Sequence, residues 1–195
     1  MEKKRIAIFI SGRGSNMKAI LKNVQAGSLQ DCCEVVLVFA NKQDARGLTI
    51  AQEFGVHTEW IESKGRQREE FDQAVVDLLK PYQLDYIVLA GYMRIMSVAL
   101  LEQYKGRIIN IHPADTAAYQ GAHAYEWACE NKLETTKITV HLIDAGVDTG
   151  PVLAQREVDL RGVQTLEDVE QRGLKVEHQF FSEVLRKVFT GEITT

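Results

Sequence analysis

The sequence predicts an α/β protein: a Rossmann-like, mostly parallel twisted sheet with helices on both faces and an antiparallel pair of strands toward the C-terminal end. Apolar runs of strand length alternate with segments whose apolar residues recur at helical spacing, the order expected for parallel strands joined by right-handed crossovers. The run Leu84–Ala90 is apolar throughout, as in a strand buried on both faces. Thr136–Ile143 and Val152–Val158 follow one another without a helix between them, so we expect this pair to be antiparallel.

The first half of the chain alternates regularly between the two kinds of element. In the first helix, Met17, Ile20 and Leu21 share one face. The next two helices stop at recognisable breaks, one at Gly55 and one before Pro81. The expected strands are Arg5–Ser11, Glu34–Ala40, Val56–Ile61 and Leu84–Ala90, and the expected helices are Ser15–Gln25, Ala45–Phe54 and Arg66–Lys80.

In the second half, a further strand includes Ile108 and Ile109 and stops at Pro113, because proline has no N–H for a strand ladder. The chain has 195 residues, 45% of them hydrophobic, and shows no repeat, low-complexity tract or linker. We therefore expect a single domain over residues 1–195. The remaining helices are expected at Val98–Tyr104, Ala122–Asn131 and Leu166–Thr190.

Charge and cysteine content exclude several classes of protein. The net charge of −4 gives no sign of the basic footprint that nucleic-acid binders carry. The first apolar run, Ile6–Ile10, is too short for a membrane span or a signal peptide. The cysteines Cys32, Cys33 and Cys129 form no C-x-x-C motif and fit free thiols in a reducing cytosol. We therefore expect a cytoplasmic protein without nucleic-acid or membrane partners.

Three polar residues are the strongest candidates for a reaction centre. Asn110 and His112 are two apart at the end of a strand, so they point to the same side, at the edge where α/β folds bind ligands. Asp148 follows the next strand-like run in a glycine-flanked turn, and its carboxylate is expected to orient the imidazole of His112 and raise its pKa. An amide donor, an imidazole and a carboxylate suit a reaction that builds an oxyanion and moves a proton.

The first strand leads into a loop of small residues, Ser11–Asn16. The loop lacks the third glycine of a dinucleotide fingerprint, because Met17 stands in its place, and no Gly-Lys-Ser/Thr of a P-loop follows. Backbone N–H groups and the positive end of the next helix would still suit a phosphate. The alternative is a tight turn in which Ser15 or Asn16 caps the helix, and the residues alone leave both interpretations open.

Several other polar residues have a structural explanation beside the functional one. Arg94 lies in the loop after the central strand, beside the expected cleft, but packing of that loop explains it slightly better. His123, which follows a glycine at the start of a helix, could line a site. A lone histidine is usually structural, however, so we expect none of His57, His123, His141 and His178 to be catalytic. No spacing of His, Cys and Glu indicates a metal ion, and no Gly-x-Ser-x-Gly elbow indicates a serine hydrolase.

Together these motifs resemble the phosphoribosylglycinamide formyltransferase family, single-domain folate enzymes of purine synthesis. The Asn-x-His pair with the aspartate is shared by the wider formyltransferase superfamily, and the Gly-Ser-Asn loop narrows the resemblance to this family. The matching segments span nearly the whole chain: Ile10–Asn16, Phe39–Lys42, Leu89–Ile95, Asn110–Pro113 and Asp144–Pro151.

The resemblance implies a reaction and a set of roles. A formyl group would pass from 10-formyltetrahydrofolate, a co-substrate used without a metal, to the amine of glycinamide ribonucleotide, in a monomer or homodimer. The N-terminal part of the domain would bind phosphate, and the C-terminal part would bind folate and carry catalysis. The implied residues are Asn110, His112 and Asp148 for catalysis; Gly14, Ser15 and Asn16 for the substrate phosphate; Glu177 for the glycinamide substrate and its amine; and Arg68, Met93, Arg94, Ile95, Met96, Asn110, Asp144, Ala145, Gly146, Val147 and Asp148 for the folate.

One segment departs from the family pattern. Where the family continues with Ser-Leu-Leu-Pro and then Tyr/Phe-Pro-Gly, this chain has Ala114–Gly121, of the same length but without two prolines and two leucines. Because proline restricts a loop, its loss predicts a loop that moves more freely. Two alternatives stay open: a folate-dependent N-formyltransferase that acts on an amino-sugar nucleotide, and a non-catalytic folate- or nucleotide-binding module.

Overall fold

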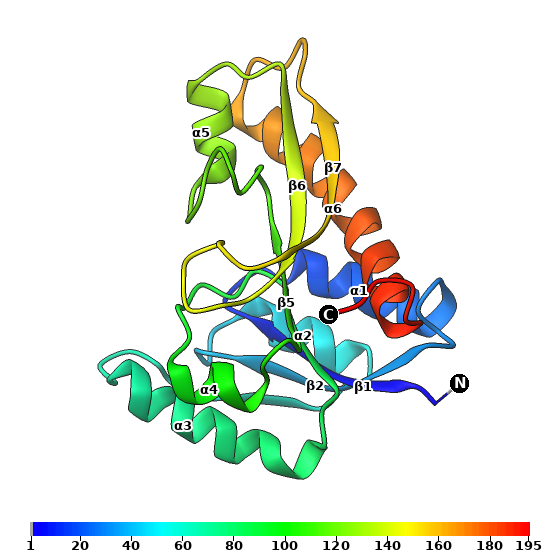
Figure 1. The fold of residues 1–195 in the computed structure, drawn as a ribbon, viewed down its shortest axis with the longest axis vertical. Coiled ribbons are helices and arrows are strands. Elements are labelled where there is room, and N and C mark those ends of the chain that lie inside the picture. Colours follow the sequence, from blue (N-terminus) through cyan, green and yellow to red (C-terminus); the bar gives the residue numbers. More distant parts are fainter. Residues whose placement is uncertain (1) are drawn as a thin grey trace.

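A seven-stranded sheet with the strand order β3-β2-β1-β4-β5-β6-β7 runs through the structure (Figure 1), a computed structural model that describes residues 2–195. Strands β1 to β5 pair in parallel, whereas β6 pairs antiparallel with both β5 and β7. The strands are β1 Lys4–Ile10, β2 Cys33–Ala40, β3 Thr58–Trp60, β4 Tyr86–Leu89, β5 Ile108–His112, β6 Thr135–Leu142 and β7 Val152–Asp159.

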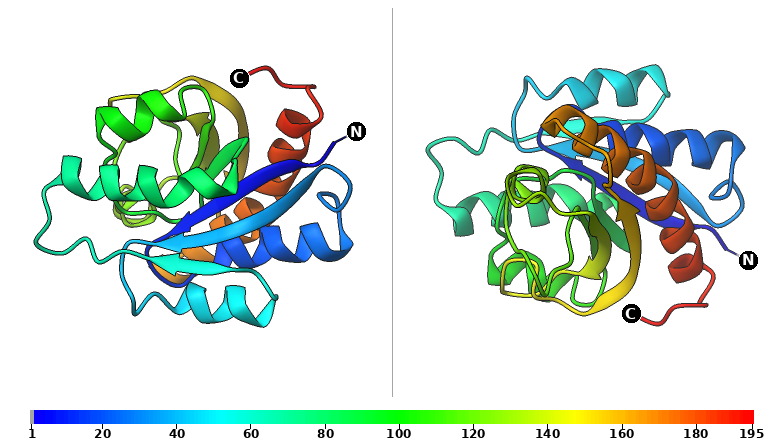
Figure 2. Two further views of the ribbon diagram at one scale, coloured as in Figure 1. Left: turned by 90° about the horizontal axis from the view of Figure 1, so that it is seen from below. Right: turned by 90° about the horizontal axis from the view of Figure 1, so that it is seen from above.

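Helices cover both faces of the sheet. Helices α1, α2 and α6 pack on one face and α3 and α4 on the other (Figure 2), while α5 packs against α6. The helices are α1 Ser15–Ala26, α2 Arg46–Glu53, α3 Arg68–Leu79, α4 Val98–Gln103, α5 Ala124–Glu130 and α6 Leu166–Phe189, with a 3₁₀ turn at Lys80–Tyr82. None of these helices within residues 2–195 is long and apolar enough to cross a membrane.

The first strand shows how the two faces are built. Successive side chains of a strand point to opposite faces. Ile6, Ile8 and Ile10 accordingly belong to the core cluster formed with α1, α2 and α6, whereas Ala7 and Phe9 belong to the cluster formed with α3 and α4. All five side chains are fully buried, because this strand is covered by helices on both faces, and its sequence is therefore apolar at every one of these positions.

The predicted fold class is confirmed, with differences of two kinds: the ends of elements shift by one or two residues, as at β4, which is Tyr86–Leu89 and not Leu84–Ala90, and one strand pairing was not predicted. The third strand is only Thr58–Trp60, shorter than the predicted Val56–Ile61, because only these residues pair in register with Val38–Ala40 at the edge of the sheet. The antiparallel pairing of β5 with β6 was not predicted, and it places His141 directly opposite Asn110. This second difference decides the composition of the site.

The strand order reverses between β1 and β4, so the loops after these two strands lie side by side. The N–H of Ser11 donates to the carbonyl of Gly91 at 3.0 Å, and the Ser11 hydroxyl accepts from the N–H of Met93 at 2.8 Å. Open α/β sheets bind ligands outside the carboxyl ends of their strands at such a reversal. A ligand site is therefore expected at the edge of the sheet where β1, β4 and β5 end.

Candidate active site

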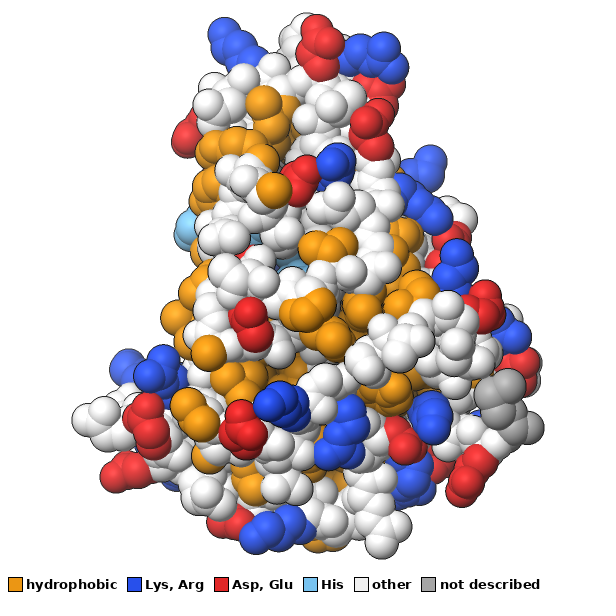
Figure 3. All heavy atoms as spheres, in the orientation of Figure 1, with side chains coloured by type: hydrophobic (Ala, Val, Ile, Leu, Met, Phe, Trp, Pro, Cys, Tyr) orange, Lys and Arg blue, Asp and Glu red, His pale blue; other side chains and the backbone are white. Residues whose placement is uncertain are grey.

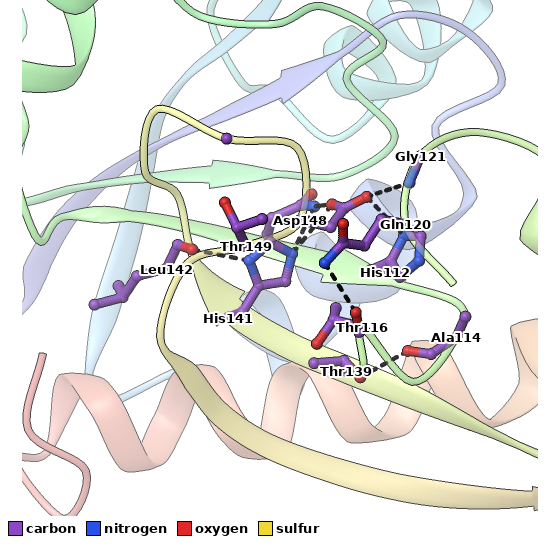
Figure 4. A network of polar contacts seen from close by, with 12 residues as sticks. His112, Ala114, Thr116, Gln120, Gly121, Thr139, His141, Leu142, Asp148 and Thr149 are labelled. Atoms are coloured by element: carbon purple, nitrogen blue, oxygen red, sulfur yellow. Dashed lines mark hydrogen bonds and ion pairs between the residues drawn. The ribbon is translucent and has the colours of Figure 1, made fainter. Parts of the chain in front are cut away.

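The structure brings Asn110, His112 and Asp148 together at the end of β5. Asp148 lies in the loop between β6 and β7 with a φ of +52°, a left-handed conformation that aspartate tolerates better than most residues. Its Oδ1 lies 3.4 Å from Nδ2 of Asn110, and its Oδ2 lies 3.4 Å from Nδ1 of His112. Figure 4 shows this carboxylate between two imidazole rings, those of His112 and His141.

His141 is the site residue that the sequence analysis missed. It has no exposed surface, and its Nδ1 lies 2.8 Å from the carbonyl of Leu142, which can only accept, so Nδ1 carries the proton. Its Nε2 lies 3.2 Å from Nδ2 of Asn110 and 3.4 Å from Oδ1 of Asp148. The signal that could have found it is the β5–β6 register, since a polar residue opposite Asn110 faces the same site.

Both ring nitrogens of His112 have partners. Nε2 lies 3.0 Å from the carbonyl of Tyr119 and therefore donates to it, so the neutral ring has its lone pair on Nδ1, toward Asp148. Burial lowers the pKa of His112 below its ordinary value, although the Asp148 charge and the Tyr119 bond act in the opposite direction. The raised pKa expected from the sequence is thus wrong for the protein without ligand, because desolvation outweighs the carboxylate.

Asp148 is held in its ionised form. Burial is the largest influence and raises its pKa, but the bond to His141, the backbone N–H of Gly121 at 2.8 Å and the charges of the two imidazoles together lower it below the ordinary value. A fixed negative charge beside the lone pair of His112 favours any proton that arrives at Nδ1. The arrangement can accept a proton and stabilise the resulting imidazolium.

The loop after β1 presents the N-terminus of α1. Gly14 is the N-cap with a φ of +74°, and a Cβ at this position would lie 2.9 Å from Cα of Gly47. Within residues 2–195 no side chain caps this helix end, and its first turn carries no acidic residue. The backbone N–H groups at Ser15 and Asn16 are therefore free to bind an anion. The alternative of a side-chain cap by Ser15 or Asn16 is wrong.

Glu177, on α6, is buried beside this loop. Its carboxylate accepts from Nδ2 of Asn16 at 2.5 Å and from the hydroxyl of Tyr125, and the residue is only 4% exposed. Burial raises the pKa of Glu177 above its ordinary value, although both of these bonds lower it. Tyr125 reaches the carboxylate because Gly173, one turn earlier on α6, has no side chain, and a Cβ there would collide with the tyrosine ring.

A groove of about 530 Å³ lies between the start of α3 and the loop after β4. Met93 and Ile95 are 71% and 53% exposed there, and exposed apolar side chains of this kind mark a ligand or partner surface. Hydrophobic side chains also spread across the middle of the face in Figure 3. The guanidinium of Arg94 lies 4.3 Å from the ring centroid of Phe71. The groove is lined by Gln67, Arg68, Glu69, Met93, Arg94 and Ile95.

Other residues implied for the folate lie in different environments. Met96 is buried in the core beside α3 and α4, outside the groove lining. The loop from Asp144 to Asp148 is closed on itself, because Asp144 accepts from the N–H of Gly146 at 3.0 Å and from the Thr149 hydroxyl at 2.6 Å. Ala145 and Val147 are exposed at its tip.

The remaining histidines do not join the site. His57 pairs with Glu59 at 3.1 Å and His123 with Glu126 at 2.9 Å, both on the surface. His178 is partly buried on α6, and burial lowers its pKa. In the part of the chain that the structure describes, no three His, Cys, Asp or Glu side chains are grouped so that they could hold a metal ion.

The fold and the site define a class: an α/β enzyme that acts on small molecules. At one edge of its sheet lie the N-terminus of α1, a groove with exposed Met93 and Ile95, and a buried cluster of one amide, two imidazoles and one carboxylate. The family model described as formyl transferase matches residues 4–185, and the chain belongs to this family.

Relatives in this family are similar over nearly the whole chain. Phosphoribosylglycinamide formyltransferase of Bacillus subtilis is 34% identical over 186 residues, covering 95% of this chain and 94% of the relative. The crystal structure of phosphoribosylglycinamide formyltransferase from Bacillus halodurans is 38% identical, has a TM-score of 0.89 and matches 94% of each chain. The trifunctional purine biosynthetic protein adenosine-3 of Gallus gallus is 33% identical over 192 residues, which are 98% of this chain and 19% of that protein.

Proposed function

We propose that this protein transfers a formyl group from 10-formyltetrahydrofolate to the amine of N1-(5-phospho-D-ribosyl)glycinamide, a step of de novo purine (IMP) biosynthesis. One observation carries the proposal: neighbouring strand ends supply the three parts that this reaction needs. The end of β1 offers an anion site, the end of β4 an exposed apolar loop, and the end of β5 the cluster of Asn110, His112 and Asp148. The similarity to formyltransferases with this name supports the same acceptor.

The acceptor is assigned to the loop at the start of α1 and to α6. The N–H groups of Ser15 and Asn16, after the turn at Gly14, suit the 5-phosphate. Glu177 suits a hydrogen-bond donor of the glycinamide part. Asn16 adds a second polar atom, because its buried Oδ1 has no hydrogen-bond partner within residues 2–195. An unpaired buried acceptor is costly, so a donor from the substrate would stabilise it.

The folate donor is assigned to the groove and to the loop from Asp144 to Asp148. Met93 and Ile95 supply exposed apolar surface for a flat ring, and Arg68 supplies a cation for a carboxylate of the tail. Arg94 lines the groove and stacks on Phe71, and Met96 is buried in the core beside α3 and α4. When bound, the folate supplies a formyl group on a nitrogen that leaves once it is protonated.

The amine attacks the formyl carbon directly, without a covalent enzyme intermediate. The contacts of the Asn110 amide, 3.2 and 3.4 Å, are long for hydrogen bonds, so its N–H can turn to the oxygen that becomes negative. His112 takes the amine's proton on Nδ1, and Asp148 stabilises the imidazolium. The same proton then passes to the departing folate nitrogen.

The proposal includes the organisation of the chain. Residues 1–195 form one formyltransferase domain, in which the N-terminal part binds phosphate and the C-terminal part binds folate and carries catalysis. Such a protein acts in the cytoplasm on small molecules, as a monomer or a homodimer, without nucleic acid or membrane partners. The net charge of −4 agrees with the absence of nucleic-acid binding.

Formyl transfer with purified protein tests the proposal. The protein is mixed with 10-formyltetrahydrofolate and either glycinamide ribonucleotide or an amino-sugar nucleotide, and the deformylated folate is followed by absorbance. We expect transfer to glycinamide ribonucleotide, loss of transfer in Asn110→Ala, and normal transfer in Asp77→Ala, a surface control on α3. Transfer to the amino-sugar nucleotide alone would reassign the acceptor. Folate binding without transfer to either would indicate a binding module.

A further inference from the structure

The loop from Ala114 to Gly121, here called the 114–121 loop, contacts both ionisable residues of the proposed reaction centre. The carbonyl of Tyr119 accepts from Nε2 of His112 at 3.0 Å, and the N–H of Gly121 donates to Oδ2 of Asp148 at 2.8 Å. Figure 4 shows the end of this loop beside the Asp148 carboxylate. The position of two backbone groups in this loop therefore sets the surroundings of both side chains.

The start of the loop is held by one carboxylate with three partners. Asp115 Oδ2 lies 2.7 Å from Nζ of Lys137, while Oδ1 accepts from the N–H of Ala117 at 3.0 Å and from Nε2 of Gln155 at 3.2 Å. Lys137 comes from β6 and Gln155 from β7, so the contacts tie the loop to two strands. We call Asp115, Lys137 and Gln155 the Asp115 clamp.

A buried hydroxyl extends the clamp to the next residue. Thr139 has no exposed surface, and its hydroxyl donates to the carbonyl of Ala114 at 2.7 Å (Figure 4) and accepts from Nε2 of Gln155 at 3.0 Å. Thr139 pairs with Gln155 across β6 and β7, and lies two residues from Lys137 on the same face of β6. These side chains therefore act on the loop from one surface of the sheet.

We propose that Asp115 is a positioning residue: together with Lys137 and Gln155 it holds the 114–121 loop so that Tyr119 and Gly121 present their backbone groups to His112 and Asp148. The inference rests on the proposed function, which makes those two side chains the proton carriers. The 114–121 loop is also the segment in which this chain departs from the family pattern. Because the loop has no prolines to restrict it, the hydrogen bonds of the Asp115 clamp supply the restraint.

The Asp115 clamp is expected to matter for the position of the catalytic groups more than for the stability of the fold. The side chains of Lys137 and Asp115 are 42% and 26% exposed, and ion pairs in such positions contribute little to stability. A displacement of catalytic groups by about 1 Å, in contrast, can slow a reaction by about 100-fold. Loss of the clamp is therefore expected to change turnover far more than the stability of the fold.

Release of the loop also predicts a change in the titration of His112. The charged or titratable groups that face this ring are Asp148, His141 and Glu177. Burial is the largest influence on His112 and lowers its pKa, whereas the Tyr119 bond raises it; the Gly121 bond lowers the pKa of Asp148. A loop that moves changes both the burial and the bonds, so the pKa of His112 is expected to shift.

The test compares Asp115→Ala, Asp115→Asn and Lys137→Met with a matched control, Asp77→Ala. Asp77 also forms a surface pair, at 2.6 Å from Lys80 in the last turn of α3 and the 3₁₀ turn after it. Two experiments are done: steady-state kinetics give kcat and KM for formyl transfer, and NMR without ligands gives the pKa of the His112 ring. The second needs no turnover, so it decides the inference even if the proposed acceptor is wrong.

We expect Asp115→Ala to lower kcat about 10- to 100-fold with little change in KM and to shift the His112 pKa, whereas Asp77→Ala changes neither kcat nor this pKa. Lys137→Arg, which keeps the ion pair, should retain activity. The double variant Asp115→Ala with Lys137→Met should lose no more activity than Asp115→Ala alone, because both substitutions remove the same contact.

A wild-type kcat and an unshifted His112 pKa in Asp115→Ala, or fully additive losses of activity in the double variant, would overturn the inference. If Asp115→Ala fails to fold, the same comparisons are made with Asp115→Asn and Lys137→Met.

Discussion

The Nε2 atom of His141 lies 3.4 Å from Oδ1 of Asp148, while Nδ1 of His112 lies 3.4 Å from the other oxygen of the same carboxylate. One carboxylate thus contacts two imidazoles, one on β5 and one on β6. Because Nδ1 of His141 donates to the carbonyl of Leu142, this ring is fixed in orientation and is not free to turn toward a substrate. His141 is in place to position Asp148.

Replacement of His141 by alanine tests this positioning role. Asn110 and Asp148 would each lose a buried partner, so we expect kcat to fall about 10- to 100-fold. The variant also leaves the carbonyl of Leu142 without its donor, which should reduce the free energy of unfolding by about 1–3 kcal/mol. Steady-state kinetics and urea unfolding measure the two effects. Full activity in a folded His141→Ala protein would show that Asp148 is oriented without it.

Replacement of Asp148 by asparagine removes the charge and keeps the shape. Without the carboxylate, the imidazolium of His112 loses the group that stabilises it, and we expect kcat to fall about 10²- to 10⁴-fold. Binding of glycinamide ribonucleotide should persist, because the phosphate is assigned to the start of α1. Calorimetric titration and single-turnover kinetics separate the two. A variant with near-normal turnover would exclude the proposed role of Asp148.

The order of strands and helices can be predicted from the sequence, because local patterns of apolar residues determine it. The continuous apolar run that contains β4 predicts a sheet covered on both faces, and Pro113 predicts where β5 ends. Asn110 and His112 could be placed on one side because two residues in one strand need no tertiary information. The pairing of β5 with β6 is a long-range choice, and without it His141 looked like an isolated histidine.

Two other features depended on packing that no local pattern shows. The direction of the His112 pKa shift follows from the burial of the ring, which outweighs the neighbouring carboxylate. The 114–121 loop has no prolines, and its restraint by Asp115 depends on side chains from two strands that become neighbours only in the sheet. Sequence reasoning is limited here because desolvation and strand register are properties of the folded chain.

Replacement of Glu177 by glutamine should affect the stability of the fold and the binding of the acceptor in different ways. The folded-state pKa of Glu177 is raised by burial, so its contribution to stability is present below its unfolded pKa and is lost as pH rises through the folded value. Above that value glutamine removes a buried charge, so we expect the urea midpoint of the variant to rise relative to that of the wild type as pH increases through it. The KM for the acceptor should rise about 10-fold or more, because a hydrogen bond to a charged group is lost.

The control for this prediction is how the difference in stability between the wild-type and Glu177→Gln proteins changes with pH. As pH falls toward the ordinary range of a glutamate, the wild-type protein regains the proton that glutamine mimics, so the difference in stability between the two proteins should shrink. A Glu177→Gln protein that is less stable than wild type at every pH would show that the amide cannot replace the two oxygen atoms that accept from Asn16 and Tyr125.

The lowered pKa of His112 predicts that the free energy of unfolding decreases below neutral pH. Its folded-state pKa lies below its unfolded value of about 6.5, so the unfolded chain binds more protons as pH falls through that value. The free energy of unfolding should therefore decrease from pH 8 to pH 5.5, and part of this decrease should be absent in His112→Gln. Urea unfolding of both proteins at the two pH values measures the difference. An identical pH dependence in the two proteins would mean that the ring titrates as it does in water.

Replacement of Gly14 by alanine tests the phosphate site through the backbone. Its φ of +74° costs a residue with a side chain about 1–2 kcal/mol, and the new Cβ would lie 2.9 Å from Cα of Gly47, so the loop must shift. We expect the KM for the phosphorylated acceptor to rise while the KM for the folate donor stays constant. Gly55→Ala is the matched control, because Gly55 also has a φ of +74° but no atom lies within 4 Å of its Cβ position. Both variants should lose stability, and only Gly14→Ala should lose affinity for the acceptor; an equal acceptor KM in the two would place the phosphate away from the start of α1.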